Sequence, residues 1–143
     1  MRKFENIQGF TLIELLIAIA ILAVLSAIAM VQFTKYRENS YKIVTKTDLK
    51  NSLTALVGFY SEFLRYPNDG SCGPGPMSCD LTDGVHTISN GIVVSRGVTI
   101  EWSVNSGGKC PDGSDKLIVK GKHQQLADWE ASFESCDYKF IGF

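Results

Sequence analysis

The sequence predicts an α+β protein, in which a long N-terminal α-helix (a stalk followed by an amphipathic half) packs on a small antiparallel β-sheet head. Three observations support this fold class. No proline occurs between Phe10 and Tyr66, so nothing interrupts a helical pattern over that length. A segment rich in Gly, Pro, Asp, Asn and Ser follows. Short runs of β-branched and aromatic residues then recur up to the C-terminus.

The first part of the predicted helix is apolar. Residues 15–31 carry no charge, and a transmembrane helix needs roughly 20 predominantly apolar residues. Arg2 and Lys3 precede the run, and cations on that side favour retention of the leader in the cytoplasm. Glu14 is the one charged residue within the run. Because a carboxylate in hydrocarbon is costly, its presence indicates a function.

The second part of the helix is predicted to be amphipathic. Apolar residues recur at spacings of three and four, which places them on one helical face: Leu49, Leu53, Leu56, Tyr60 and Phe63. Val57 and Leu64 are expected to widen this face. Pro67 ends the pattern. The simplest interpretation is one continuous helix from about Phe10 to about Arg65, roughly 84 Å long.

The remaining residues predict a loop and then a sheet. Residues 66–90 have a loop composition and are expected to form no regular structure. Strands are predicted over residues 98–104, 116–122 and 128–135, with a closing strand over 137–143. Leu126, Trp129 and Phe133 also suit a short helix, so that alternative stays open for the third strand.

Four cysteines, Cys72, Cys79, Cys110 and Cys136, all follow the apolar segment. They are therefore expected on the oxidising side of the membrane, where disulfides persist. Four cysteines allow three pairings. The sequence has no C-x2-C spacing of the kind zinc sites use, and its two histidines are isolated, so we predict disulfides and neither a metal nor a cofactor.

The predicted topology favours one of these pairings. Cys72 and Cys79 lie within the loop and would close it internally. If the strands at 116–122 and 128–135 form a hairpin, Cys136 lies beside the start of the first strand, where the loop that carries Cys110 also enters. We therefore predict the pairs Cys72–Cys79 and Cys110–Cys136.

The segment Gly9-Phe10-Thr11-Leu12-Ile13-Glu14, followed by the apolar run, resembles the processing site of type IV pilins and of the related type II secretion pseudopilins. Residues 35–51 also look like the middle of the long helix in bacterial type IVa pilins. The resemblance implies that a prepilin peptidase cuts between Gly9 and Phe10 and N-methylates Phe10. It also implies that Glu14 is an assembly residue, paired with the α-amino group that the cut creates.

The resemblance implies a division of the chain into a removed leader (1–9), a hydrophobic N-terminal helix (10–36) and a periplasmic or extracellular head (37–143). The helix would span the inner membrane before assembly and form the filament core afterwards. The expected partners are other copies of the chain, the peptidase and an inner-membrane assembly platform. The formal net charge of −1 gives no pull toward nucleic acid, and none is predicted as a partner.

Several alternatives remain. A secretory signal peptide would put a small-residue cleavage site after its apolar core, whereas here the glycine precedes the run. A plain membrane anchor explains the apolar run but not Glu14 or the Gly-Phe junction. A pseudopilin or a minor, priming pilin is the main rival, and some pseudopilins bind calcium in a C-terminal loop. Asp112 and Asp115 flank a turn there, but a solvated acidic turn is the simpler interpretation. A ligand-binding module at a pilus tip is a further rival, and no motif predicts an enzyme.

Overall fold

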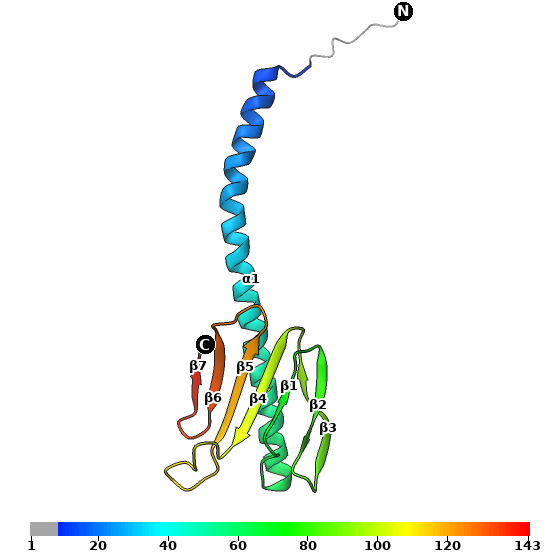
Figure 1. Ribbon diagram of the computed structural model, residues 1–143, viewed down its shortest axis with the longest axis vertical. Coiled ribbons are helices and arrows are strands. Elements are labelled where there is room, and N and C mark those ends of the chain that lie inside the picture. Colours follow the sequence, from blue (N-terminus) through cyan, green and yellow to red (C-terminus); the bar gives the residue numbers. More distant parts are fainter. Residues whose placement is uncertain (1–8) are drawn as a thin grey trace, which may run out of the picture. The chain divides into compact units, whose positions relative to one another are not determined.

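The computed structural model describes residues 9–143, and Figure 1 shows the order of its elements. The chain divides into two compact units with a boundary between Arg37 and Glu38. The first unit contains the N-terminal part of helix α1 (Leu12–Phe63). The second unit, called the head below, contains the rest of α1 and all the strands found in the described chain.

Helix α1 is uninterrupted over 52 residues, which confirms the predicted helix to within two residues at each end. It ends where Leu64 takes a left-handed backbone conformation, with φ of 56°. The Leu64 N–H still donates to the Tyr60 carbonyl at 2.8 Å, which closes the last turn. Pro67 follows and cannot continue a helix.

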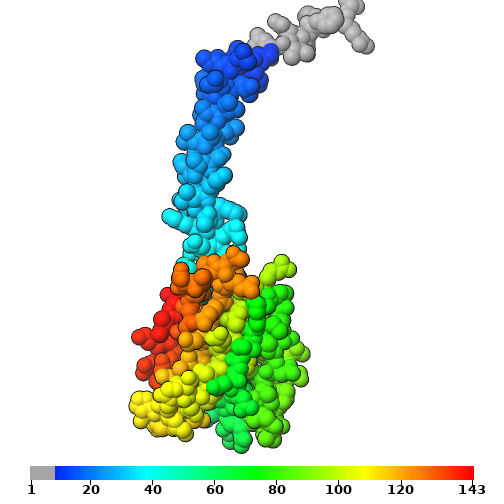
Figure 2. Space-filling model, in the orientation of Figure 1, coloured from blue at the N-terminus to red at the C-terminus, as the bar shows by residue number. Residues whose placement is uncertain are grey.

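The sheet is antiparallel throughout, and it completes the predicted α+β class. Its order is β1 (Gly70–Cys72), β4 (Val98–Val104), β5 (Leu117–His123), β6 (Glu130–Glu134) and β7 (Lys139–Ile141). A separate antiparallel pair, β2 (Met77–Thr82) and β3 (Thr87–Val94), lies beside β1 (Figure 1). The connection between β4 and β5 protrudes at one end of the head (yellow in Figure 2).

The prediction of a loop over residues 66–90 is wrong, because β1, β2 and the start of β3 lie within it. The turn-forming residues do make turns, but the short segments between them form strands. β1 pairs with the non-consecutive strand β4, with Gly70 opposite Trp102, and β2 forms a hairpin with β3, with Cys79 opposite Ile92. The pairing partner decides whether such a short strand forms, and local composition does not reveal it. The short-helix alternative around Trp129 is also wrong, since β6 occupies that region.

The face of α1 that packs on the sheet differs in part from the predicted one. Its buried residues are Thr45, Asp48, Leu49, Ser52, Leu56 and Phe59. Tyr60, Val57 and Leu64 were expected on this face but are 40%, 49% and 80% exposed. Successive residues of a helix are rotated by about 100° about its axis. A residue one position away from a buried one therefore points away from the buried face. Hydrophobicity alone missed Asp48 and Ser52, which are polar and yet buried.

Gly121 in β5 lets the helix approach the sheet closely. A Cβ atom at this position would lie 3.0 Å from the Thr45 side chain and 3.3 Å from that of Leu49. Alternate residues of β5 are buried, including Leu117 and Val119, so this is the strand face toward the core. The helix thus rests against β5 at a point where no side chain intervenes.

Two aspartates fasten loops to the helix. The buried Asp48 carboxylate accepts hydrogen bonds from the Ser95 N–H at 2.7 Å and from its hydroxyl at 3.1 Å, which ties α1 to the turn between β3 and β4. Asp83, in the turn between β2 and β3, accepts the backbone N–H groups of Val85 and His86 at 2.8 and 2.7 Å. These bonds satisfy the carboxylates inside the fold.

Asp83 also meets two groups that anchor its turn to the end of α1. Arg65 Nε lies 3.6 Å from the Asp83 carboxylate, and His86 Nδ1 lies 3.1 Å from it. The His86 ring stacks on Phe63 with a centroid distance of 4.4 Å. The hydrogen bonds from the His86 backbone, above all, hold the pKa of Asp83 well below its ordinary value.

Two disulfides close loops of different length. Cys72 joins Cys79 across a separation of seven residues, and Cys110 joins Cys136 across a separation of 26. The second bond lies beside the start of β5, where the Ser135 N–H donates to the Leu117 carbonyl at 3.0 Å. It therefore fastens the protruding loop between β4 and β5 to the end of β6.

Replacing both members of a pair by alanine should cost more stability for the longer loop. The chain-entropy account gives a loss of about 3.5 kcal/mol for Cys110–Cys136 and about 2.5 kcal/mol for Cys72–Cys79. Cys72 and Cys110 are both buried, so the packing cost is similar and the difference reflects the loop. Urea unfolding of the full chain in detergent micelles measures both values. The reverse order would contradict the loop-length argument.

Asp83→Asn should destabilise the head at neutral pH and should make no difference in strong acid. The folded pKa of Asp83 lies below the unfolded one. The ionised Asp83 therefore contributes fully to the free energy of unfolding above the ordinary aspartate pKa. This contribution disappears as the pH falls through the depressed pKa of the folded state. Unfolding curves of both chains between neutral pH and strong acid test this. A stability gap that stays constant over this range would show that the Asp83 charge is not responsible.

Candidate functional site

The predicted processing junction lies just before α1. Gly9 and Phe10 are outside any helix or strand, and Phe10 is 89% exposed. A Cβ atom at Gly9 would meet no atom within 4 Å, so the described fold does not itself require a glycine at this position. The rest of the expected leader, residues 1–8 with Arg2 and Lys3, lies outside the described residues.

Thr11 and Glu14 form a capping box at the start of α1. The Thr11 N–H and hydroxyl donate to the same Glu14 carboxylate oxygen, Oε2, at 2.9 and 2.8 Å. In return, the Glu14 N–H donates to the Thr11 hydroxyl oxygen at 3.3 Å. This arrangement satisfies backbone donors that a helix start otherwise leaves unpaired, and such a cap is typically worth about 1 kcal/mol.

The capping box gives Glu14 a role that the sequence analysis missed. The signal was present, because a threonine followed three residues later by a glutamate before an apolar run is a helix-start signature. Oε2 accepts both Thr11 bonds, and no bond to Oε1 is found in the described part of the chain. A carboxylate oxygen in that position is able to accept a further donor, such as an amine.

The helix that follows presents apolar side chains without burying them. Between Phe10 and Phe33, every large hydrophobic residue is at least half exposed within the chain. Ser26 and Thr34 donate their hydroxyls to the carbonyls of Leu22 and Met30, so neither hydroxyl needs water. Of the described helices, α1 is long and apolar enough to cross a membrane, with a mean hydropathy of 2.8 over its most apolar window.

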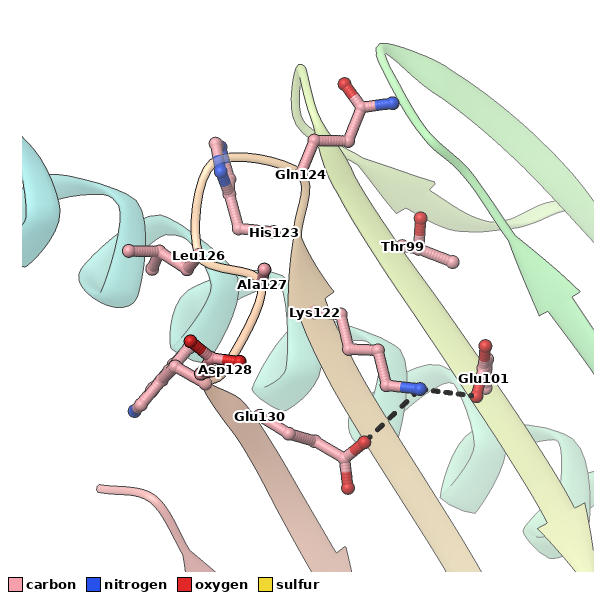
Figure 3. Close-up of a pocket in the computed structure, with 10 residues that line it drawn as sticks. Thr99, Glu101, Lys122, His123, Gln124, Leu126, Ala127, Asp128 and Glu130 are labelled. Atoms are coloured by element: carbon pink, nitrogen blue, oxygen red, sulfur yellow. Dashed lines mark ion pairs between the residues drawn. The ribbon is translucent and has the colours of Figure 1, made fainter.

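A hollow in the head, of about 590 Å³, lies where β4, β5 and the connection from β5 to β6 meet (Figure 3). Lys122 extends across it, with its ammonium 3.3 Å from Glu130 and 3.6 Å from Glu101. Lys120 lies 3.2 Å from Glu130, and Lys116 pairs with Glu134. The hydrogen bond with Glu130, and then the charge of Glu101, raise the pKa of Lys122. These residues form a self-neutralising ladder of charges on the outer face of the sheet.

The two candidate metal ligands of the head, Asp112 and Asp115, bond to neighbouring residues of the protein. Asp112 accepts the Ser114 N–H at 2.9 Å and also its hydroxyl, and these bonds lower the pKa of Asp112. Asp115 accepts from Asn105 at 2.9 Å and lies 3.3 Å from Lys109. Within residues 9–143, no group of three His, Cys, Asp or Glu side chains is placed to hold a metal ion. The acidic turn is therefore built from its own hydrogen bonds.

Comparisons with known proteins match part of the chain. Residues 6–30 match the family described as the prokaryotic N-terminal methylation motif. The type IV major pilin protein PilA of Myxococcus xanthus (strain DK1622) is 48% identical to this chain over 59 residues. Those residues are 41% of this chain, but they span only 27% of that relative. No solved structure matches the chain.

The two matches agree with the structure of the junction. The methylation motif covers Gly9, Phe10, the capping box and the exposed apolar part of α1. In the head, the second part of α1 packs on an antiparallel sheet, as the resemblance implies. The chain therefore carries the prokaryotic N-terminal methylation motif over residues 6–30 and is similar, over part of its length, to a type IV major pilin.

Proposed function

We propose that this chain is a structural subunit of a type IV pilus. A prepilin peptidase cleaves it and it polymerises into an extracellular helical filament that serves adhesion, motility or uptake. One observation carries the proposal: the carboxylate Glu14 lies at the start of an exposed apolar helix, within the segment that matches the N-terminal methylation motif. The role is structural, as in the pilin family, and the proposal needs no catalytic group or cofactor.

The proposal assigns a role to each part of the chain. Residues 1–9 are the leader that the peptidase removes, and Phe10 becomes the N-methylated first residue. Residues 10–36 anchor the subunit in the inner membrane until an assembly platform extracts it. Residues 37–143 form the head, which is periplasmic before assembly and exposed on the filament afterwards.

The exposed apolar side chains of α1 support a subunit that lies first in the membrane and later in a filament. No residue of α1 before Thr45 is buried within the described chain, so its apolar side chains need cover from outside. Lipid supplies that cover in the membrane, and the corresponding helices of other copies supply it in a filament. The gain from exchanging lipid for protein is small per residue and comes from close packing and polar pairing. A polar pair that sets the register then matters more than additional apolar area.

Glu14 is suited to set that register. In the membrane, its carboxylate is satisfied locally through Thr11. Cleavage after Gly9 creates an α-amino group on Phe10, and this cation is the natural partner for the second carboxylate oxygen. Whether the amine comes from the same chain or from a neighbour, a pair at one depth of the helix bundle fixes the axial position of the subunits.

A pseudopilin or a minor, priming pilin is the alternative assignment. It shares the cleavage site and the anchoring helix, so Gly9 and Glu14 do not distinguish it. The acidic turn does not favour it, because Asp112 and Asp115 already bond to Ser114, Asn105 and Lys109. The matched relative is named a major pilin, which supports the first assignment.

Gly9→Val should leave the precursor uncut in the membrane. The described fold has room for a side chain at position 9, so the variant should fold and insert normally. The peptidase, however, needs close backbone access at the bond it cuts. Intact mass measurement of the membrane-bound chain gives the result. Mature-length chain at the wild-type level would exclude Gly9 as the cleavage residue.

Glu14→Ala and Glu14→Gln should both permit cleavage and membrane insertion but reduce filament yield more than about a hundredfold. This loss follows because an unpaired buried charge costs roughly 3–5 kcal/mol. Sheared surface fibre is compared with membrane-bound subunit in a strain that lacks the wild-type chain.

The glutamine variant separates two roles of Glu14. It keeps the acceptor oxygen that caps the helix through Thr11 but has no charge to pair with an amine. If Glu14→Gln assembled normally and Glu14→Ala did not, capping rather than charge pairing would be the function. Normal fibre from both variants would remove Glu14 from assembly.

A further inference from the structure

A small hollow of about 160 Å³ lies between the end of α1 and the protruding loop that connects β4 and β5. Three tyrosine rings, one carboxylate and two serines line it: Tyr60, Tyr66, Tyr138, Asp115, Ser114 and Ser135. They come from α1, the segment after it, the protruding loop and the connection from β6 to β7, which lie at the same end of the head (Figure 1). Within the described chain, the lining contains no lysine, arginine or histidine.

The aromatic part of this lining is partly packed and partly exposed. The rings of Tyr60 and Tyr66 lie against each other, with a centroid distance of 4.6 Å and an interplanar angle of 31°. Tyr138 is 83% exposed, and its backbone is left-handed, with φ of 48°. A bulky side chain rarely takes that conformation, and an exposed ring contributes little to folding. Both features at one residue indicate that Tyr138 has a role outside the packing of the head.

The lining favours positive charge. Asp115 is its one ionised group at neutral pH. Burial, and after it the neighbouring phenols and Asp115, raise the pKa of the Tyr66 phenol, so Tyr66 stays neutral. The negative charge of Asp115, which opposes ionisation of Tyr66, attracts a cation. The rings add to this attraction because the face of an aromatic ring is electronegative.

The hydrogen bonds of the lining distinguish between kinds of cation. Asp115 Oδ1 accepts from Asn105 at 2.9 Å and lies 3.3 Å from the Lys109 ammonium. The Ser135 hydroxyl oxygen accepts a backbone N–H of β5 at 2.9 Å, and the Ser114 hydroxyl donates within its own turn. A primary ammonium needs acceptors for three N–H donors and is strongly hydrated. A quaternary ammonium has no N–H and is held by rings and charge, so it suits this hollow better.

The size of the hollow fits one such group. A cavity of about 150 Å³ accommodates a benzene molecule, and a trimethylammonium group is of similar size. We propose that the hollow binds the trimethylammonium group of a choline-type compound. Tyr60, Tyr66 and Tyr138 form an aromatic cage around it, and Asp115 is its counter-ion. The site lies apart from Glu14 in the chain, so it is a further binding activity of the head that does not depend on the proposed pilus function.

The test observes the tyrosine rings of the full chain in maltoside micelles by NMR, with isotope-labelled tyrosine. The chain has five tyrosines, so each ring signal can be assigned by substitution. Choline should shift the signals of the three cage tyrosines and leave those of Tyr36 and Tyr41 unchanged. The neutral analogue, with a tert-butyl group in place of trimethylammonium, should bind about fivefold more weakly, as expected for loss of the cation–π attraction at a partly exposed site.

Three substitutions test the assigned roles. Tyr138→Leu removes a mostly exposed ring, and Asp115→Asn removes the charge but keeps the shape. Each should weaken choline binding about fivefold. Lys109→Gln should instead tighten it, because Lys109 competes with the ligand for Asp115. The matched controls Tyr36→Leu and Asp128→Asn, both exposed and outside the lining, should leave the affinity unchanged.

Glycerophosphocholine is titrated beside choline to identify the source of the group. Binding of either compound supports the proposal, and the tighter one shows whether the trimethylammonium group is recognised free or esterified to phosphate.

Four results would overturn the inference. One is no shift of the cage tyrosines at choline concentrations well above about 1 mM. Another is equal binding of the neutral analogue, which would identify an apolar hollow. A third is binding of lysine at least as tight as that of choline, which would identify a primary ammonium as the ligand. The last is wild-type affinity in both Tyr138→Leu and Asp115→Asn, each folded by circular dichroism. None of these results would affect the proposed pilus function.

Discussion

The burial of one face of α1 against the sheet is the interaction on which the head depends. The buried residues of the helix begin only at Thr45, which lies with Leu49 against Gly121 of β5. Leu49, Leu56 and Phe59 belong to the same buried core as residues of the strands. Both aspartate ties, at Asp48 and Asp83, fasten loops to this same half of the helix or to its end. The N-terminal half has no such partner within the chain. Its stability as a helix must come from its own hydrogen bonds, its cap and the medium around it.

The sequence was sufficient for the parts of the fold that are governed by periodicity. The proline-free run predicted α1, and alternation predicted β4, β5 and β6, because burial on one face repeats at a fixed spacing. It was insufficient where long-range pairing decides. β1 has only three residues, and it forms a strand by pairing with β4, where Cys72 lies opposite Ile100. Phe59 was missed and Tyr60 was wrongly placed, since their sequence spacings fit the helical face almost equally well.

In the candidate site, too, the local features could be predicted from the sequence and the long-range ones could not. Gly9, Phe10 and Glu14 are recognisable because their types and spacing belong to a short linear motif that needs no folded partner. The hydrogen bonds from Thr11 to Glu14 were also local, within three residues, but their recognition required attention to backbone donors rather than to charge. A hollow of about 480 Å³ beside Arg96 was not predictable either, because residues of α1, of the turn between β3 and β4 and of the connection after β5 line it together. The sheet register and the hydrogen bond from the Gln124 N–H to the Gly97 carbonyl set the proximity of these segments.

The charge ladder on the outer face of the sheet has a consequence at a scale larger than one subunit. Each lysine of the ladder lies beside a glutamate, so its field is cancelled within a few ångströms of the surface. This face of the head would therefore project little electrostatic potential into solution. Mutual repulsion between two such faces would be weak over a wide range of salt concentrations. Their lateral association, as in bundling, would then depend on short-range shape and on the polar side chains of the protruding loops rather than on ionic strength.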